Sequence, residues 1–193
     1  MAKKKSLKTA SPPIQIPIVI QQKVTSEASL TLDMWRAAKS AALNIYQPSK
    51  YLLCELFDDI LHDLHLWSVY DKRIMAVTNT NWTFTVDGKE HEQITDLTKK
   101  YFFEKLIKYI IQSKLHGYSV IEVDFRTQKC ELVPRAHCII ESSLVLQDPY
   151  MNEGWDYTEA PFDRTTIAVG EDWDLGLLFK AASMIILKRG DVS

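Results

Sequence analysis

The sequence predicts an α+β fold in which long amphipathic helices pack on a small mixed or antiparallel β-sheet. Two observations lead to this prediction. Apolar residues recur at spacings of three and four between residues 51 and 115, and short alternating stretches bounded by turn residues follow from residue 118 onward. With 193 residues, of which 46% are hydrophobic and 25% charged, the chain is long enough to bury a core.

The first 48 residues are predicted to form a tail, an arm and one helix. Residues 1–13 contain four lysines and a pair of prolines, so we expect a disordered basic tail, solvated rather than bound to DNA or an acidic neighbour. Within the arm and helix of 14–48, the β-branched stretch 14–24 is interrupted by a proline and fits an edge strand or extended arm. An alanine-rich helix follows in 29–45, with Thr31 as its N-cap.

Two consecutive helices are predicted between Tyr51 and Trp82, with a break near Asp63. The apolar positions expected on their buried side are Leu53, Leu56, Phe57, Ile60, Leu61, Leu64, Trp67, Val69, Tyr70, Ile74 and Val77. Charged residues occupy the opposite side, which suits contact with water. The polar run TNTNW has weak helix propensity and ends the pattern.

A further long helix is predicted at 94–115, after a short strand and a turn at Asp87–Gly88. Its expected core face consists of Ile94, Leu97, Tyr101, Phe102, Leu106, Tyr109 and Ile110. Gly117 would end this helix, because glycine readily takes the left-handed conformation just past a helix terminus.

The sheet is predicted to begin directly after this glycine. Tyr118–Phe125 alternates as a half-buried strand, 126–129 reads as a turn, and 131–140 would form the second strand of a hairpin. Pro134 would bend that second strand or place it at an edge, since proline cannot donate a ladder hydrogen bond.

The remaining chain is expected to add two short strands, at 144–146 and 165–169. A long loop at 148–161 would separate them. Two aromatic residues of this loop, Trp155 and Tyr157, would either contact another subunit or lie back over the sheet.

Residues with metal-binding chemistry are sparse in this sequence. His62 and His65 could share one helical face, but no carboxylate completes an H-E-x-x-H pattern, and the nearby Asp58, Asp59 and Asp63 fit a solvated acidic face. The group Cys130, His137 and Cys138 lacks C-x-x-C spacing. We therefore predict no catalytic residue, no metal ligand and no cofactor.

A metal-dependent nuclease is the enzymatic alternative. Glu122 and Asp124 share one face of the predicted strand, with Lys129 beyond, whereas such enzymes would place Glu-x-Lys a short spacer after an acidic residue. The sequence also lacks a phosphate-cradling G-x-x-x-x-G-K motif. The pattern thus favours a protein that is not an enzyme.

The cysteine and aromatic residues are interpreted as structural. Cys54 lies on the apolar helix face as a buried reduced thiol, and Cys130 and Cys138 could lie across a hairpin, although a disulfide would be unusual in a cytosolic product. The aromatic residues at helical spacings, expected in the core rather than in a base-stacking platform, are Trp67, Tyr101, Phe103 and Tyr109. The longest apolar stretches are too short to span a bilayer, so no membrane association is predicted.

Three segments of the chain resemble the portal proteins of Mu-like phages. The first combines Asp63, His65, Leu66, Ser68, Val69, Arg73, Ala76 and Val77, with Trp82 a few residues on. The second consists of Gly117, Ser119 and Glu122 at a helix end followed by a strand. The third consists of Gly176, Leu177, Leu178, Ala181 and Lys188 in a helix after a strand.

This resemblance implies a wing-like α+β domain over 49–193, incomplete at its C-terminus because family members continue into a stem and clip. It also implies a structural role in a homo-oligomeric ring at the capsid vertex of the virion, through which DNA passes without sequence-specific binding. The implied partners are the major capsid protein, terminase and a head–tail adaptor, met during assembly in the bacterial host cytoplasm. A portal-derived binding or adaptor module is the second alternative.

Overall fold

The computed structural model describes residues 31–151 and 153–190 and confirms the predicted α+β class. The predictions for 1–13 and 14–24 lie outside these residues. The α-helices are α1 (Leu32–Ala42), α2 (Tyr51–Ile60), α3 (Leu64–Thr78), α4 (Glu92–Thr98), α5 (Tyr101–His116) and α6 (Gly176–Gly190). The strands are β1 (Thr85–Val86), β2 (Lys89–Glu90), β3 (Tyr118–Asp124), β4 (Lys129–Leu132), β5 (Cys138–Ile139), β6 (Leu144–Leu146), β7 (Gly154–Asp156) and β8 (Thr166–Gly170). Three 3₁₀ turns are η1 (Arg135–His137), η2 (Ile140–Ser142) and η3 (Phe162–Arg164).

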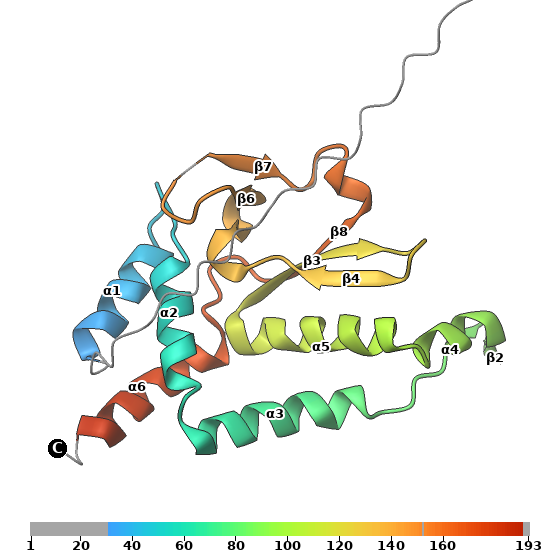
Figure 1. The fold of residues 1–193 in the computed structure, drawn as a ribbon, viewed down its shortest axis with the longest axis horizontal. Coiled ribbons are helices and arrows are strands. Elements are labelled where there is room, and N and C mark those ends of the chain that lie inside the picture. Colours follow the sequence, from blue (N-terminus) through green and yellow to red (C-terminus); the bar gives the residue numbers. More distant parts are fainter. Residues whose placement is uncertain (1–30, 152, 191–193) are drawn as a thin grey trace, which may run out of the picture.

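Helices α1 and α3 both begin at a side-chain cap. The Thr31 hydroxyl caps α1 by accepting a hydrogen bond from the Met34 N–H at 3.3 Å. The predicted break near Asp63 is confirmed, because its carboxylate caps α3 by accepting from the Leu66 N–H at 2.9 Å. In Figure 1, α3 and α5 run side by side beneath the sheet, and α1, α2 and α6 gather at one end of the molecule.

The single helix predicted at 94–115 is wrong, since the structure divides it into α4 and α5. The chain takes an extended conformation at Lys100, with φ −87° and ψ 146°. The Thr98 hydroxyl donates at 3.1 Å to the carbonyl oxygen of Trp82, a contact with a distant part of the sequence. The predicted end of α5 is confirmed, because Gly117 adopts a φ of +94°.

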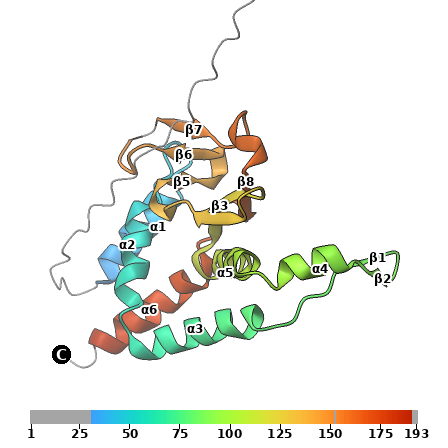
Figure 2. The same cartoon turned by 45° about the vertical axis from the view of Figure 1, so that its right-hand side comes forward.

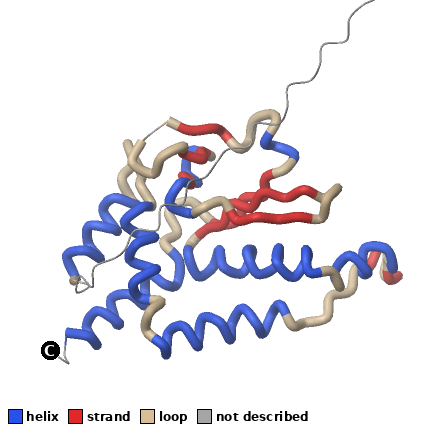
Figure 3. Tube along the Cα trace, in the orientation of Figure 1, coloured by secondary structure: helices blue, strands red, loops and turns tan. Residues whose placement is uncertain are grey.

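The central sheet consists of β4, β3 and β8, all antiparallel, with β3 in the middle (Figure 3). Val123 lies opposite Cys130, and Ser119 lies opposite Val169. The first four residues of β3 are buried on both faces, so the predicted alternation holds only beyond Ile121. Helix α5 packs against one face of β3.

The continuous strand predicted at 131–140 is wrong, although Pro134 does bend the chain there. Strand β4 ends at Leu132, the turn η1 follows the proline, and β5 begins a different sheet at Cys138. Proline cannot donate a ladder hydrogen bond, which favours the end of the pairing with β3 before this position. The predicted strands at 144–146 and 165–169 are confirmed as β6 and β8.

The loop predicted at 148–161 contains a strand that the sequence did not indicate. Strand β7 pairs antiparallel with β6, with Trp155 opposite Val145, and completes the sheet β5-β6-β7. Tyr157 is buried against this sheet, whereas Trp155 is exposed. One of the two aromatic residues therefore lies over the sheet and the other faces solvent.

The main core lies where α1, α2, α3, α5 and α6 meet. Its fully buried residues include Ala42, Leu53, Ile60 and Ala182. Several predicted core positions are wrong, because the structure leaves Leu64, Trp67, Val69, Ile94 and Tyr101 exposed. The prediction for the side chain of Leu97 falls outside what the structure describes. In the described part of the chain, no helix is both long and apolar enough to cross a bilayer.

Residues 79–98 form a distal tip that projects away from the body of the molecule (Figure 2). Its β1–β2 hairpin turns at Asp87 and Gly88, whose φ values of +51° and +76° confirm the predicted Asp-Gly turn. All four strand residues of the hairpin are exposed. The Phe84 N–H donates to the Thr95 hydroxyl at 3.2 Å and fastens the hairpin to α4.

Candidate functional site

The histidines weighed as metal ligands, His62 and His65, are both exposed. Between them, the Asp63 carboxylate caps α3 and accepts a hydrogen bond from Lys188 at 3.1 Å. The Leu66 N–H and then the Lys188 ammonium hold the pKa of Asp63 below its usual value. Among the described residues, no group of three or more His, Cys, Asp or Glu side chains is arranged to hold a metal ion.

The carboxylates of the nuclease alternative, Glu122 and Asp124, are exposed on β3, and Lys129 lies opposite Asp124 across the β3–β4 pair. Glu122 lies opposite Glu131 rather than opposite a base. The Asp124 carboxylate accepts hydrogen bonds from the Thr127 hydroxyl at 2.8 Å and from the Arg126 N–H at 2.8 Å. These bonds lower the pKa of Asp124 and show that its role is to hold the β3–β4 turn.

The three thiols are free and embedded in the protein. The Cys54 sulfur lies 4.0 Å from the Tyr118 hydroxyl, and desolvation raises the pKa of this thiol to about 12. Burial also raises the pKa values of Cys130 and Cys138, which lie in different sheets rather than across one hairpin. Thiols of this kind are poor nucleophiles at neutral pH.

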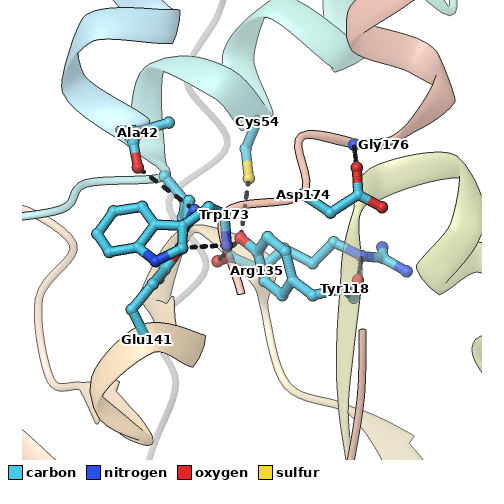
Figure 4. A network of polar contacts seen from close by, with 9 residues as sticks. Ala42, Cys54, Tyr118, Arg135, Glu141, Trp173, Asp174 and Gly176 are labelled. Carbon is cyan, nitrogen blue, oxygen red and sulfur yellow. Dashed lines mark hydrogen bonds and ion pairs between the residues drawn. The ribbon is translucent and has the colours of Figure 1, made fainter. Parts of the chain in front are cut away.

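A buried ion pair joins two residues that are 91 positions apart, Lys50 and Glu141. Their side chains are 1% and 5% exposed, and Lys50 Nζ lies 2.6 Å from Glu141 Oε1. The ammonium also donates to the Ala42 carbonyl oxygen at 3.4 Å, and Glu141 Oε1 accepts from the Trp173 N–H at 3.3 Å. One ion pair thus fastens the ends of α1 and α2 to η2 and to the turn before α6 (Figure 4).

The guanidinium of Arg135 forms a second set of contacts beside this pair. Its Nε donates to the Tyr118 carbonyl oxygen at 3.1 Å, and Nη2 donates to Gln112 at 3.2 Å and to the Ser119 hydroxyl at 3.0 Å. In return, the buried Tyr118 hydroxyl donates to the Arg135 carbonyl oxygen at 2.6 Å. Because these partners come from α5, β3 and η1, the arginine locks a helix, a strand and a turn together.

His116 lies at the buried end of α5, and its Nε2 is 3.2 Å from the Tyr70 hydroxyl. The ring of Phe57 packs edge-on against it at 5.5 Å between centroids. Desolvation, followed by the charge of Arg135, lowers the pKa of His116 to about 3. The imidazole is therefore neutral at physiological pH and acts as a packed polar side chain.

Two glycines from separate motifs, Gly117 and Gly176, cross backbone to backbone. A Cβ added to Gly176 would lie 2.4 Å from the Gly117 nitrogen, and one added to Gly117 would lie 2.3 Å from the Asp174 carbonyl oxygen. Both residues have left-handed φ values, +94° and +74° respectively. The Asp174 carboxylate accepts from the Gly176 N–H at 3.0 Å, which fixes the start of α6 (Figure 4).

We refer to these contacts together as the polar clamp. Its members are Lys50, Gly117, Tyr118, Arg135, Glu141, Trp173 and Gly176. The clamp positions charges and backbone but presents no pair of groups able to act as nucleophile and base. What this arrangement does is hold helices and sheets in a fixed relation.

A hollow of about 440 Å³ lies between the end of α3, the distal tip and α5. Its walls include the rings of Trp82 and Phe103, together with threonine, asparagine and lysine side chains. The ammonium of Lys99 is already paired with Asp96 at 2.8 Å. Their hydrogen bond raises the pKa of Lys99 and lowers the pKa of Asp96, as in an ordinary exposed ion pair.

Residues 54–193 match the family model described as the portal protein of Mu bacteriophage. The chain belongs to this family. Searches of curated proteins and of solved structures found no match.

The matched region contains all three segments that resembled Mu-like portals in the sequence, and it covers more than half of the chain. Portal proteins in general are structural proteins, which agrees with a centre built of packing contacts rather than of reacting groups. The structure adds that Gly117 and Gly176, from the second and third segments, touch each other. The resemblance gave no sign of this contact.

Sequence reasoning missed the main members of the clamp, Lys50, Arg135 and Glu141. A lysine before an apolar helix and a glutamate between short strands are both ordinary surface residues by pattern. The sequence does not show that they meet, because 91 residues separate them. The order R-A-H after Pro134 gave equally little indication of a buried guanidinium.

Proposed function

We propose that this portal protein is a subunit of a homo-oligomeric ring at one capsid vertex. DNA would be packaged and ejected through the ring, and the tail would attach to it. The family match over residues 54–193 carries this proposal. The subunits would associate by shape and contact area, and no covalent bond would be made or broken.

The implied partners are the major capsid protein, the terminase and a head–tail adaptor. Energy for packaging would come from the terminase, in keeping with the lack of a phosphate-cradling motif in this sequence. A formal net charge of −2 is compatible with a ring through which DNA passes, because a strongly basic protein would bind the DNA through its phosphates. The assembled ring would belong to the virion, and its subunits would gather in the cytoplasm of the bacterial host.

The polar clamp supports a structural role of this kind. A ring that transmits a packaging force requires subunits whose helices and sheets do not shift relative to each other. The buried Lys50–Glu141 pair and the Gly117–Gly176 crossing join α1, α2, α5, η2 and α6 at one point. Such close packing resists deformation.

The test is a deletion of the coding sequence in the phage or prophage that carries it. We expect heads without packaged DNA, restored by supplying the chain in trans, and antibody labelling at a single vertex of each wild-type head. DNA-filled heads in the deletion strain would overturn the proposal. Association of the chain with host or phage proteins outside the head would instead favour a portal-derived binding or adaptor module.

A further inference from the structure

One face of the molecule carries an acidic shelf, which we define as residues 148–163. It contains five carboxylates and no basic residue: Asp148, Glu153, Asp156, Glu159 and Asp163. The first and third carboxylates hold turns by accepting hydrogen bonds from the N–H groups of Tyr150 and Thr158. The side chains of Glu153, Glu159 and Asp163 are exposed and make no ion pair within the described residues.

The acidic shelf also exposes large apolar side chains. Tyr150 is 72% exposed, Met151 is 57% exposed and Trp155 is 37% exposed. Tyr150 is anchored by the ring of Tyr51 at 4.6 Å between centroids. Exposed apolar side chains rimmed by charges of one sign are typical of a protein–protein contact surface.

A second surface also combines exposed aromatic side chains with charged residues, and here the charged residues are lysine and arginine. This basic patch consists of Lys100, Tyr101, Phe125, Arg126 and Lys129, at the start of α5 and around the β3–β4 turn. Tyr101 is 76% exposed and Phe125 is 63% exposed. Of the carboxylates nearby, Asp124 is occupied inside the turn.

The two segments of the basic patch are held together by direct contacts. Lys100 Nζ donates to the Gln128 side-chain oxygen at 3.0 Å, and the rings of Phe102 and Phe125 lie 6.0 Å apart in an edge-on arrangement. The patch is therefore a single surface. It lies at the far end of the β3–β4 hairpin, whereas β7 of the acidic shelf lies along a different side of the molecule (Figure 1).

We propose that the acidic shelf of one copy of this chain binds the basic patch of the next copy. Each surface offers exposed aromatic residues beside a local excess of charge. The shelf is acidic, although the exposed Arg164 follows it, and the patch is basic, with Asp124 held in the turn and Glu131 paired with Lys105. The two charge excesses are of opposite sign and complement each other. Because the surfaces are different and lie on different sides, the contact is head-to-tail and repeats from copy to copy. A repeating contact of this kind forms a ring when the rotation between neighbouring copies closes. The inference therefore rests on the proposed function, which supplies the ring, and names the contact that would build it.

The experiment is a charge swap, read out as the mass of the full chain in solution and its change with concentration and salt. The patch variant is Arg126→Glu/Lys129→Glu, and the shelf variant is Glu153→Lys/Glu159→Lys. Each alone should weaken self-association roughly 100-fold, because like charges then face each other. A chain with all four substitutions should assemble again, and so should a 1:1 mixture of the two variants.

The control is Lys72→Glu/Arg73→Glu on the exposed side of α3, which makes the same charge change elsewhere and should leave assembly as in the wild type. Assembly by each variant alone, as strong as in the wild type, would overturn the contact while leaving the ring proposal intact. Pairing of the mixed variants without any large wild-type ring would support the contact and contradict the ring. Failure of the four-fold variant and of the mixture to associate, with wild-type rings present, would overturn the contact as well.

Discussion

The polar clamp and the distal tip are both rich in polar residues, but they are built in opposite ways. In the clamp, a lysine and a glutamate side chain that are 1% and 5% exposed join segments 91 residues apart. In the tip, all four hairpin strand residues are exposed, and hydrogen bonds such as that from Phe84 to Thr95 tie it to α4. From this difference we infer that burial and long-range connection, rather than polarity, make the clamp more resistant to local opening than the tip.

The clamp also shows what an ion pair does in a protein interior. Removing two charges from water costs about as much as their attraction returns, so the Lys50–Glu141 pair adds little net stability. The Oε2 atom of Glu141 is buried and has no hydrogen-bond partner among the described residues. We interpret the pair as a device that selects one arrangement of η2 and α6, since alternative arrangements would leave a buried charge alone.

The largest effect is expected from breaking this pair. Glu141→Ala leaves the Lys50 ammonium buried alone and should lower the free energy of unfolding by about 3–5 kcal/mol. Denaturant unfolding followed by circular dichroism measures the change. The double variant Lys50→Met/Glu141→Leu should recover most of the loss, and Glu171→Ala in the exposed Lys114 pair should leave stability as in the wild type. Equal losses for Glu141 and Glu171 would contradict the assignment of the clamp.

The second-largest effect is expected at Gly176 in the clamp, and it is compared with Gly88 in the tip, which has a similar left-handed conformation. Gly176 has a φ of +74°, and the Cβ of Gly176→Ala would lie 2.4 Å from the Gly117 nitrogen. The substitution should therefore lower the free energy of unfolding by about 2–4 kcal/mol. Gly88→Ala in the tip has a φ of +76° and no atom within 4 Å, so only the backbone term of about 1 kcal/mol applies. Thermal unfolding of the two variants measures the difference. A loss as large at Gly88 as at Gly176 would show that the close crossing does not matter.

A third effect is the acid sensitivity of the packed helix end near the clamp. The folded pKa of His116 is about 3, against an ordinary value of 6.5, so the unfolded chain binds a proton that the folded chain does not. Stability from this residue is present above pH 6.5 and falls as the pH drops toward 3, by about 1.4 kcal/mol per pH unit at most. Unfolding measured across this range should be flatter for His116→Gln. The same slope in wild type and variant would assign the acid sensitivity to other groups.

The smallest effect on overall stability is expected in the distal tip. Thr95→Val removes the hydroxyl that accepts from the Phe84 N–H, and should change the global free energy of unfolding by less than about 1 kcal/mol. Hydrogen exchange should nevertheless become faster at the amides of β1 and β2, because the hairpin can then open locally. Loss of protection across β3 as well would mean that the tip and the body unfold as one unit.

Local signals in the sequence predicted local structure well. Asp63 as a break, Gly117 as a helix end and Asp87–Gly88 as a turn were all identified, because each depends on the conformation of one or two residues. The break between α4 and α5 was missed because the apolar spacing continues from Leu97 to Tyr101 across it, whereas the backbone at Lys100 is extended.

Features that depend on partners far along the chain could not be predicted. Strand β7 depends on its pairing with β6, in which Trp155 lies opposite Val145. The clamp depends on the ion pair between Lys50 and Glu141. Periodicity placed Trp67 and Tyr101 in the core, but none of the elements that the structure describes covers them. The portal family itself was identified from short motifs, two of which contribute the glycines that cross in the clamp.

The most direct test of a ring-forming portal subunit is the mass of the assembled protein, measured by light scattering and confirmed by electron microscopy. We expect a particle many times heavier than the 22.2 kDa chain, with rotational symmetry about a central opening, from this chain or from any longer product of its locus. A monomer or a closed dimer in both cases, at every concentration and salt condition, would contradict the ring.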